Sequence, residues 1–393
     1  MSLPRDVNFI LERLSSRGYS AHVVGGAVRD SLIGRPLGDF DITTDALPEQ
    51  TKACFSDFRT VDTGIKHGTV TLVLNGTPYE ITTYRVDGDY KDNRHPDQVS
   101  FTANLGEDLA RRDFTVNAMA YNPECGLCDP FGGRTDAEKK IIRAVGDPYL
   151  RFSEDALRIL RALRFASVLG FEIEALTASA ARELCENLSS ISKERVYTEF
   201  KKLIMGKNAL GVLREYAFVF DVSLGGFEVR SLPESNLFDR ADYLTRLAAL
   251  FLLNSSEPQL SADRVLTELK TDKFTRTHTV SVLSAYSNVF FDNQKTVLIA
   301  LAKYGKEVIE GVLSLGILTG RFTDTEGDIF SCALECGIPY RISELAVRGT
   351  DLLSLGIKGE QVGEALNALL YAVIGGESGN DKTSLLLYLG KSK

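Results

Sequence analysis

The spacing of hydrophobic positions changes about a third of the way along the chain. In the first part, a helical pattern over 7–17 precedes a buried apolar run at 21–24 that is typical of a strand. Further strands are expected at 39–42, 69–74 and 78–85. The last two are separated by Asn75 and Gly76, a pair that favours a tight hairpin turn. Residues 1–138 are therefore predicted to form an α/β domain.

From residue 139 onward, apolar positions recur at helical spacing and few strand signals remain. Helices are expected at 153–169, 174–186, 193–205, 240–253, 260–270, 295–303 and 359–374. This change of pattern predicts the α+β class, with an α/β domain followed by an all-α region. We divide that region into 139–206 and 207–393, although no Pro-, Gly- or Ser-rich linker marks these boundaries.

Composition narrows the function classes only slightly. The 393 residues contain 45 Lys and Arg against 53 Asp and Glu, so the formal net charge is -8. As a sum over the chain, this charge disfavours a polyanionic partner, but a basic stripe can be hidden within it. The longest apolar stretches, 247–253 and 366–374, fall short of the roughly 18 residues that cross a bilayer.

The N-terminus lacks the apolar segment of a secretory signal, and the six cysteines fit reduced thiols. We therefore expect a cytoplasmic protein without membrane contact.

Gly25 and Gly26 lie between the predicted strand at 21–24 and a helical segment that contains Arg29. Glycines let backbone N–H groups approach a phosphate at the positive end of a helix, and an arginine in the first turn adds a bidentate cation. The motif is compatible with a triphosphate cradle. A simple turn between strand and helix has the same sequence.

Asp39 and Asp41 alternate with apolar residues, so a strand places both carboxylates on one face. Such a pair can hold Mg²⁺. Glu80, on a later predicted strand, becomes a third carboxylate if that strand lies beside the first, as two-metal phosphoryl transfer requires. Solvated surface charge is the alternative for all three residues.

Residues 111–117 combine two arginines with a carboxylate and an amide. Arg112 can pair with a phosphate, while Asp113 and Asn117, four residues apart, can meet ribose hydroxyls. An ion pair between neighbouring Asp and Arg residues is equally compatible with the sequence.

A helix over 154–165 has an apolar arc and an opposite polar arc. The polar arc carries Asp155, Arg158, Arg161 and Arg164. Leu157 and Phe165 interrupt it, which indicates a groove instead of open water; a solvated helix face remains the alternative.

In combination, these segments resemble the class II tRNA nucleotidyltransferase and poly(A) polymerase family, in the polymerase β superfamily. The matching motifs, in the family's order, are GGAVRD at 25–30, GDFD at 38–41, RRDFTVNA at 111–118, DPFGG at 129–133, EDALR at 154–158 and ERVYTE at 194–199. Residues 63–70 and the segment 87–99 resemble the CCA-adding branch, in which 87–99 corresponds to a flexible loop.

The resemblance implies a polymerase-β-like catalytic head at 1–138, a helical neck at 139–206 that recognises the base, and a helical body and tail at 207–393 that bind tRNA. It assigns Mg²⁺ to Asp39 and Asp41. It assigns the nucleotide to Gly25, Gly26, Arg29, Arg112, Asp113, Asn117, Arg161 and Arg164, and base selection to Asp155 and Arg158. The 194–199 motif is expected to brace the helix that carries this base-reading pair.

The implied reaction is template-independent addition of CCA, from CTP and ATP, to the 3′ end of tRNA, with release of pyrophosphate by two-metal phosphoryl transfer. Candidate contacts to tRNA phosphates are Arg182, Lys193, Arg195, Lys201, Lys202 and Lys207. The oligomeric state is left open.

Several alternatives remain. An A-adding tRNA nucleotidyltransferase or a poly(A) polymerase would share the chemistry. A metal-dependent phosphohydrolase in the helical half is disfavoured because a single histidine, His278, follows residue 138. A non-catalytic RNA-binding protein would not require Asp39 and Asp41.

Overall fold

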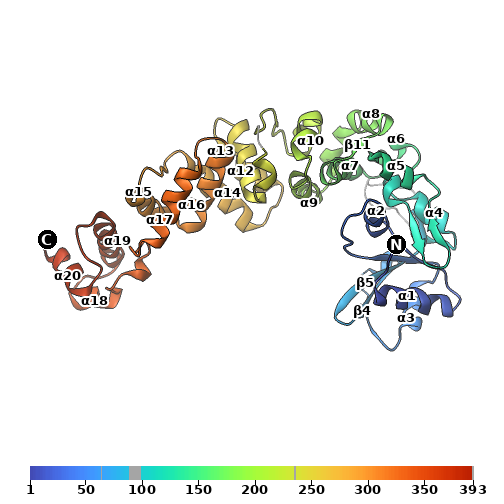
Figure 1. Cartoon of the computed structure of the whole chain (residues 1–393), viewed down its shortest axis with the longest axis horizontal. Helices are drawn as coiled ribbons and strands as arrows, with labels where there is room; N and C mark the ends of the chain where they lie inside the picture. Colours follow the sequence, from blue (N-terminus) through green and yellow to red (C-terminus); the bar gives the residue numbers. More distant parts are fainter. Residues whose placement is uncertain (63, 88–98, 234–235, 392–393) are drawn as a thin grey trace. The chain divides into compact units, whose positions relative to one another are not determined.

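The computed structural model describes residues 1–62, 64–87, 99–233 and 236–391. The chain forms two compact units, Met1–Glu228 and Val229–Lys393, which are described separately (Figure 1). The division falls downstream of the expected boundary at 206. The three-part division into 1–138, 139–206 and 207–393 stays a prediction.

The first unit is built around a mixed seven-stranded sheet with the order β3-β4-β5-β2-β1-β8-β9. The strands are β1 (Ala21–Val24), β2 (Asp41–Thr44), β3 (Arg59–Val61), β4 (Thr69–Leu74), β5 (Thr77–Thr83), β8 (Ala120–Asn122) and β9 (Gly126–Cys128). β2 and β5 run parallel, whereas the other described pairings of this sheet are antiparallel. The hairpin expected at Asn75 and Gly76 is confirmed: both residues have positive φ, and Leu74 pairs with Thr77.

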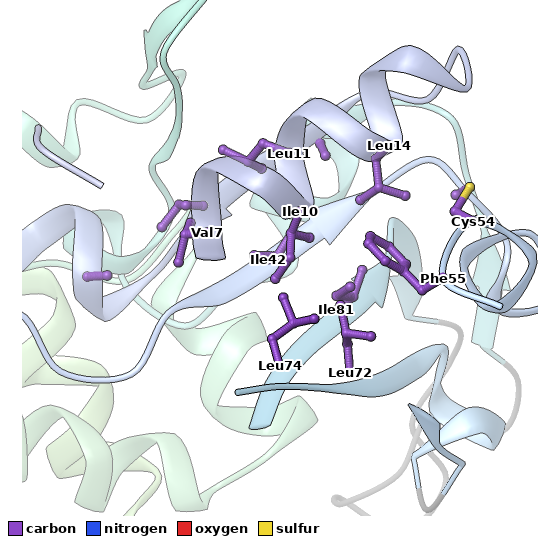
Figure 2. Close-up of a cluster of buried hydrophobic side chains, with 14 of the residues drawn as sticks. Val7, Ile10, Leu11, Leu14, Ile42, Cys54, Phe55, Leu72, Leu74 and Ile81 are labelled. Carbon is purple, nitrogen blue, oxygen red and sulfur yellow. The ribbon is translucent and has the colours of Figure 1, made fainter. Parts of the chain in front are cut away.

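A hydrophobic core joins this sheet to α1 (Arg5–Ser16) and α3 (Pro48–Cys54) (Figure 2). Ile42 of β2 and Ile81 of β5 are buried in it together with Ile10 of α1. Side chains alternate between the two faces of a strand, so Asp41 and Glu80 belong to the face opposite these helices. The strand expected at 39–42 begins at Asp41, and Asp39 precedes it.

The first unit contains further helices and short strands. They are α2 (Gly26–Leu32), η1 (Ile65–His67), β6 (Arg85–Asp87), β7 (Val99–Phe101), α4 (Leu105–Ala110), η2 (Thr115–Asn117), α5 (Gly133–Lys139), β10 (Ile141–Ile142), α6 (Pro148–Glu154), α7 (Leu157–Leu169), β11 (Glu172–Ile173), α8 (Ala175–Glu183), η3 (Cys185–Ser190), α9 (Lys193–Ile204), α10 (Ala209–Glu215) and α11 (Ala217–Ser223).

The single helix expected at 153–169 is wrong, because α6 ends at Glu154 and α7 begins at Leu157. Asp155 between them has extended backbone angles, φ -146 and ψ 102. Its Oδ1 accepts a hydrogen bond of 3.1 Å from the backbone N–H of Leu157. A short side chain that bonds nearby backbone competes with helix continuation, which explains the interruption.

All regular elements among the described residues of the second unit are helices. It contains η4 (Phe238–Arg240), α12 (Tyr243–Asn254), α13 (Pro258–Glu268), α14 (Lys273–Tyr286), α15 (Gln294–Tyr304), α16 (Lys306–Leu318), α17 (Asp324–Glu335), η5 (Ile342–Glu344), α18 (Gly349–Ser354), α19 (Glu360–Gly375) and α20 (Lys382–Lys391). The predicted α+β class is therefore confirmed. Among the described residues, we find no helix with the length and apolar character needed to span a bilayer.

Candidate active site

Two carboxylates meet where β2 and β5 run side by side. The register pairs Ile42 with Ile81, so Asp41 and Glu80 occupy neighbouring positions on the face away from the hydrophobic core. Partial desolvation, followed by the negative charge of Glu80, raises the pKa of Asp41; Arg112 opposes this shift and Asp39 adds to it. The strand adjacency on which the assignment of Glu80 depended is therefore present.

The turn at Gly25 lies directly beside this acidic pair. Gly25 has φ 71 and ψ -130, a conformation that side chains disfavour, and it leads into α2. A Cβ built on Gly25 would lie 3.5 Å from Arg112 Nη1 and 4.0 Å from Asp41 Oδ2. The glycine turn, a guanidinium and a carboxylate thus meet at one point of the sheet.

Replacing Gly25 with Ala tests this arrangement. We expect Gly25→Ala to lower the free energy of unfolding by about 1–3 kcal/mol through backbone strain. Nucleotide addition should fall more than about tenfold, because the methyl group enters the space between Arg112 and Asp41.

Gly18→Ala is the matched control, because Gly18 has φ 86 and no atom within 4 Å of a built Cβ. This variant should lose stability and keep its activity. Equal activity losses in the two variants, measured by labelled-nucleotide incorporation and thermal unfolding, would contradict the arrangement.

Arg112 is hydrogen-bonded to the buried carboxylate of Asp108, a residue outside the motifs identified in the sequence. Its Nη2 donates a hydrogen bond of 3.2 Å to Asp108 Oδ2, and Arg111 pairs with the other oxygen at 2.7 Å. The local ion pair considered for this segment thus involves Asp108 and not Asp113.

Asp113 and Asn117, expected at the ribose, form a chain with two arginines. Arg29 Nη1 donates to Asn117 Oδ1 at 2.6 Å, and Asn117 Nδ2 donates to Asp113 Oδ1 at 3.3 Å. Arg161 donates to Asp113 Oδ2 from Nε at 2.8 Å and from Nη2 at 2.6 Å. Burial alone would raise the pKa of Asp113, but the Arg161 charge and these hydrogen bonds lower it overall.

The polar arc of α7 faces the protein interior. Leu157 and Phe165 are buried, and the guanidinium carbon of Arg164 lies 3.8 Å from the centre of the Phe165 ring. Arg164 also pairs with Glu199 of α9 at 2.5 Å, and Arg161 lies 3.7 Å from the same carboxylate. The solvated-face alternative is therefore wrong, while the role of Arg161 and Arg164 as nucleotide contacts stays a prediction.

The expected base-reading pair lies at the junction of α6 and α7. Arg195 of α9 binds Asp155 with both terminal nitrogens, at 2.7 and 3.4 Å. Arg158 donates from Nη1 to Glu154 at 2.5 Å and to the backbone carbonyl of Arg151 at 3.0 Å. Two residues of the 194–199 motif, Arg195 and Glu199, thus contact Asp155 and, on α7, Arg161 and Arg164, whereas Arg158 is held by Glu154. These contacts agree with the expected bracing role of the motif.

The remaining expectations are tested only in part. Lys201 and Lys202 are exposed on α9, where Lys193 is half-buried, while Arg195 is engaged by Asp155. Residues 88–98, the bulk of the expected flexible loop at 87–99, lie outside the described residues. Within the described residues, no group of three or more His, Cys, Asp or Glu side chains is arranged to hold a metal ion.

Both the sequence and the structure of this chain are similar to those of known proteins. Residues 21–143 match the poly A polymerase head domain, and residues 170–216 match a domain described as a probable RNA- and SrmB-binding site of polymerase A. The CCA-adding enzyme of Leuconostoc citreum is 38% identical over 96% of this chain and 94% of its own length. The CCA-adding enzyme of Pediococcus pentosaceus is 36% identical over 98% and 97%, respectively. A crystal structure of the Bacillus stearothermophilus CCA-adding enzyme in complex with CTP superposes with a TM-score of 0.82 at 33% identity, covering 100% of this chain and 98% of that one.

Proposed function

Because the chain belongs to the CCA-adding enzyme family, with its poly A polymerase head and helical body, we propose that it adds CCA to the 3′ end of tRNA from CTP and ATP and releases pyrophosphate. The similarity extends over nearly the whole length of both this chain and its relatives. The junction of Gly25, Arg112 and Asp41 is the observation that best supports nucleotidyl transfer at this site.

Nucleotidyltransferases of this family use a divalent metal ion, and we propose Mg²⁺ held by Asp39 and Asp41. Mg²⁺ prefers oxygen ligands and is bound through one or two carboxylates, with water and substrate phosphates completing its shell. The absence of a three-ligand cluster among the described residues is compatible with that preference. Desolvation first, and then the negative charge of Glu80, raise the pKa of Asp41, and a bound cation would neutralise that charge. When bound, the metal supplies Lewis-acid activation and neutralises phosphate charge. Glu80 contributes negative charge beside Asp41, and its direct ligation remains a proposal.

The triphosphate is proposed to lie along the turn at Gly25 and Gly26. Backbone N–H groups without a neighbouring Cβ can approach phosphate oxygens, and Arg112 provides a cation at the same point. Arg29 is 8% exposed and fixed by Asn117 and Asp30, so it orients the start of α2 and adds positive charge there.

Base selection is proposed for Asp155 and Arg158. A carboxylate only accepts hydrogen bonds and a guanidinium only donates them. Cytosine and adenine both present an amino group beside an unprotonated ring nitrogen, which matches that order, whereas uracil and guanine reverse it. Arg195 holds Asp155, and Glu154 with the backbone carbonyl of Arg151 holds Arg158, so both side chains have fixed orientations.

The helices that follow the head domain, in both units, are proposed to bind tRNA phosphates through shape and charge instead of sequence. Lys193, Lys201 and Lys202 on α9 remain candidates. We also propose a cytoplasmic location, since the relatives are CCA-adding enzymes of bacteria.

One assay separates this function from its nearest alternative. Purified protein is offered three tRNAs that end before CCA, after C and after CC, with labelled CTP or ATP. We expect C on the first two substrates and A on the third. Addition of A alone, and only to the CC-ended tRNA, would identify an A-adding enzyme. Long A tracts without C would identify a poly(A) polymerase.

A further inference from the structure

We propose that Asp108 is a positioning residue for nucleotide binding, which holds Arg112 against the strand that carries Asp41. This inference rests on the proposed function, because it assumes that Arg112 contacts the nucleotide. Asp108 lies outside the motifs that carry the family resemblance, and it is not among the proposed ligands of metal or nucleotide.

Asp108 is 0% exposed in α4, and both of its oxygens accept hydrogen bonds. Oδ2 accepts from Arg112 Nη2 at 3.2 Å and from Thr43 Oγ1 at 3.3 Å. Oδ1 accepts from Arg111 at 3.0 and 2.7 Å, and from the backbone N–H of Arg85 at 3.3 Å. Three separate segments of the first unit therefore meet at one carboxylate.

The contact with Thr43 connects Arg112 to the metal-binding strand. Thr43 lies two residues after Asp41 in β2, so both side chains are on the same face of the sheet. Asp108 Oδ2 lies within hydrogen-bond distance of both Arg112 Nη2 and Thr43 Oγ1, and so it places the guanidinium beside β2, the strand of Asp41. The single hydrogen of the Thr43 hydroxyl is shared with the backbone carbonyl of Thr82 at 3.1 Å. The Arg112 guanidinium and the Asp41 carboxylate are also the groups that a Cβ at Gly25 would approach.

The charge balance leaves Arg112 able to bind an anion. Asp108 carries one negative charge for two guanidiniums, Arg111 and Arg112. Asp108 bonds to Nη2 of Arg112, while Nη1 lies beside the Gly25 turn; Nε is buried, and the side chain as a whole is 20% exposed. The carboxylate thus orients Arg112 while leaving positive charge and donors for a phosphate.

The test is a double-mutant cycle that measures KM and kcat for CTP and ATP. In Asp108→Asn, the amide can accept from one arginine but presents N–H groups to the other, so Arg112 loses its fixed orientation. We expect KM for both nucleotides to rise about tenfold with a smaller change in kcat, since an oriented charge-assisted contact is lost. Arg112→Ala should raise KM at least as much. The double variant should have the same KM values as Arg112→Ala, because Asp108 acts through Arg112.

Asp136→Asn is the matched control. Asp136 is also buried, and it accepts hydrogen bonds from Thr115 at 2.7 Å and Arg143 at 3.1 Å without contacting Arg112. It should lower the unfolding temperature and leave both KM values unchanged. If Asp108→Asn does not fold, Thr43→Val keeps the side-chain shape and removes the hydroxyl contacts to Asp108 and to the Thr82 carbonyl. It should raise KM about two- to fivefold in the presence of Arg112, and should not raise KM when added to Arg112→Ala.

The outcomes distinguish the two proposals. If Arg112→Ala leaves KM unchanged, the assumed nucleotide contact of Arg112 is wrong. If Arg112→Ala raises KM but the Asp108 and Thr43 variants do not, or if their effects multiply with that of Arg112→Ala, Asp108 does not position Arg112 and the inference fails.

Discussion

Asp41→Asn is expected to reduce the rate of nucleotide addition by at least about 10³-fold while the protein stays folded. Asp41 belongs to both the proposed metal site and the junction with Gly25 and Arg112. Stabilisation of charge that develops in a transition state is worth several kcal/mol, and a neutral amide supplies much less of it to a divalent cation. Single-turnover incorporation of labelled CTP measures the loss directly.

The same substitution should make the protein more stable. Desolvation and the charge of Glu80 raise the pKa of Asp41, so the folded protein binds this proton more tightly than the unfolded chain. Above the folded pKa, the ionised carboxylate therefore opposes folding, and this penalty is relieved as the pH falls through that pKa. A neutral Asn removes the penalty at pH 7, so thermal unfolding measured without divalent metal, in the presence of a chelator, should move to higher temperature.

Asp45→Asn provides the control on the same segment of chain. Asp45 follows β2 and accepts a hydrogen bond of 2.8 Å from the backbone N–H of Ser20. The Asn amide oxygen can still accept this bond, so the variant removes only the charge and should change stability little and leave activity intact. Near-normal turnover by a folded Asp41→Asn protein would refute the assignment of Asp41, and an unfolding temperature that falls would refute the electrostatic account.

Asp155→Ala has the second-largest expected effect, which is on selectivity. The variant should incorporate UTP and GTP with a relative efficiency about one to two orders of magnitude higher than the unmodified protein, because a bidentate base contact contributes about 1–3 kcal/mol of discrimination. Competition between CTP and UTP on a tRNA lacking CCA measures the ratio. Loss of Asp155 also leaves Arg195 without its carboxylate, so the overall rate should fall.

Asp147→Ala is the control for this effect. Asp147 caps α6 by accepting a hydrogen bond of 2.9 Å from the Tyr149 N–H, and its loss should destabilise the protein by about 1 kcal/mol. Its nucleotide selectivity should not change. An Asp155→Ala protein that retains full preference for CTP and ATP would show that base reading resides elsewhere.

The sequence predicted those parts of the site that depend on local patterns. Alternation along a strand places Ile42 in the core and Asp41 on the other face, and the glycine pair marks the turn before α2. Motif order added the assignment of these residues to nucleotide chemistry. The adjacency of Glu80 was left as a condition on strand pairing, and the parallel pairing of β2 with β5 meets that condition.

The contacts between distant segments were not predictable in the same way. The fully buried Asp108 has the sequence context of an ordinary helix residue, and only the fold brings Thr43 and Arg85 to it. Similarly, the periodicity of 153–169 did not reveal that Asp155 interrupts the helix. A polar residue on the exposed side of a helix and a polar residue that bonds the backbone between two helices give the same hydrophobic pattern. Pairing of Arg161 with Asp113 depends on tertiary packing.

The parallel pairing of β2 with β5 has a consequence for the order of folding. Parallel neighbours cannot be joined by a tight turn, and here α3, β3 and β4 intervene along the chain. The β4–β5 hairpin can form early because its contacts are local, whereas its docking onto β2 must first close a long loop. We expect Asp41 and Glu80 to be brought together in that late step, so that their mutual repulsion arises only after most of the sheet has been established.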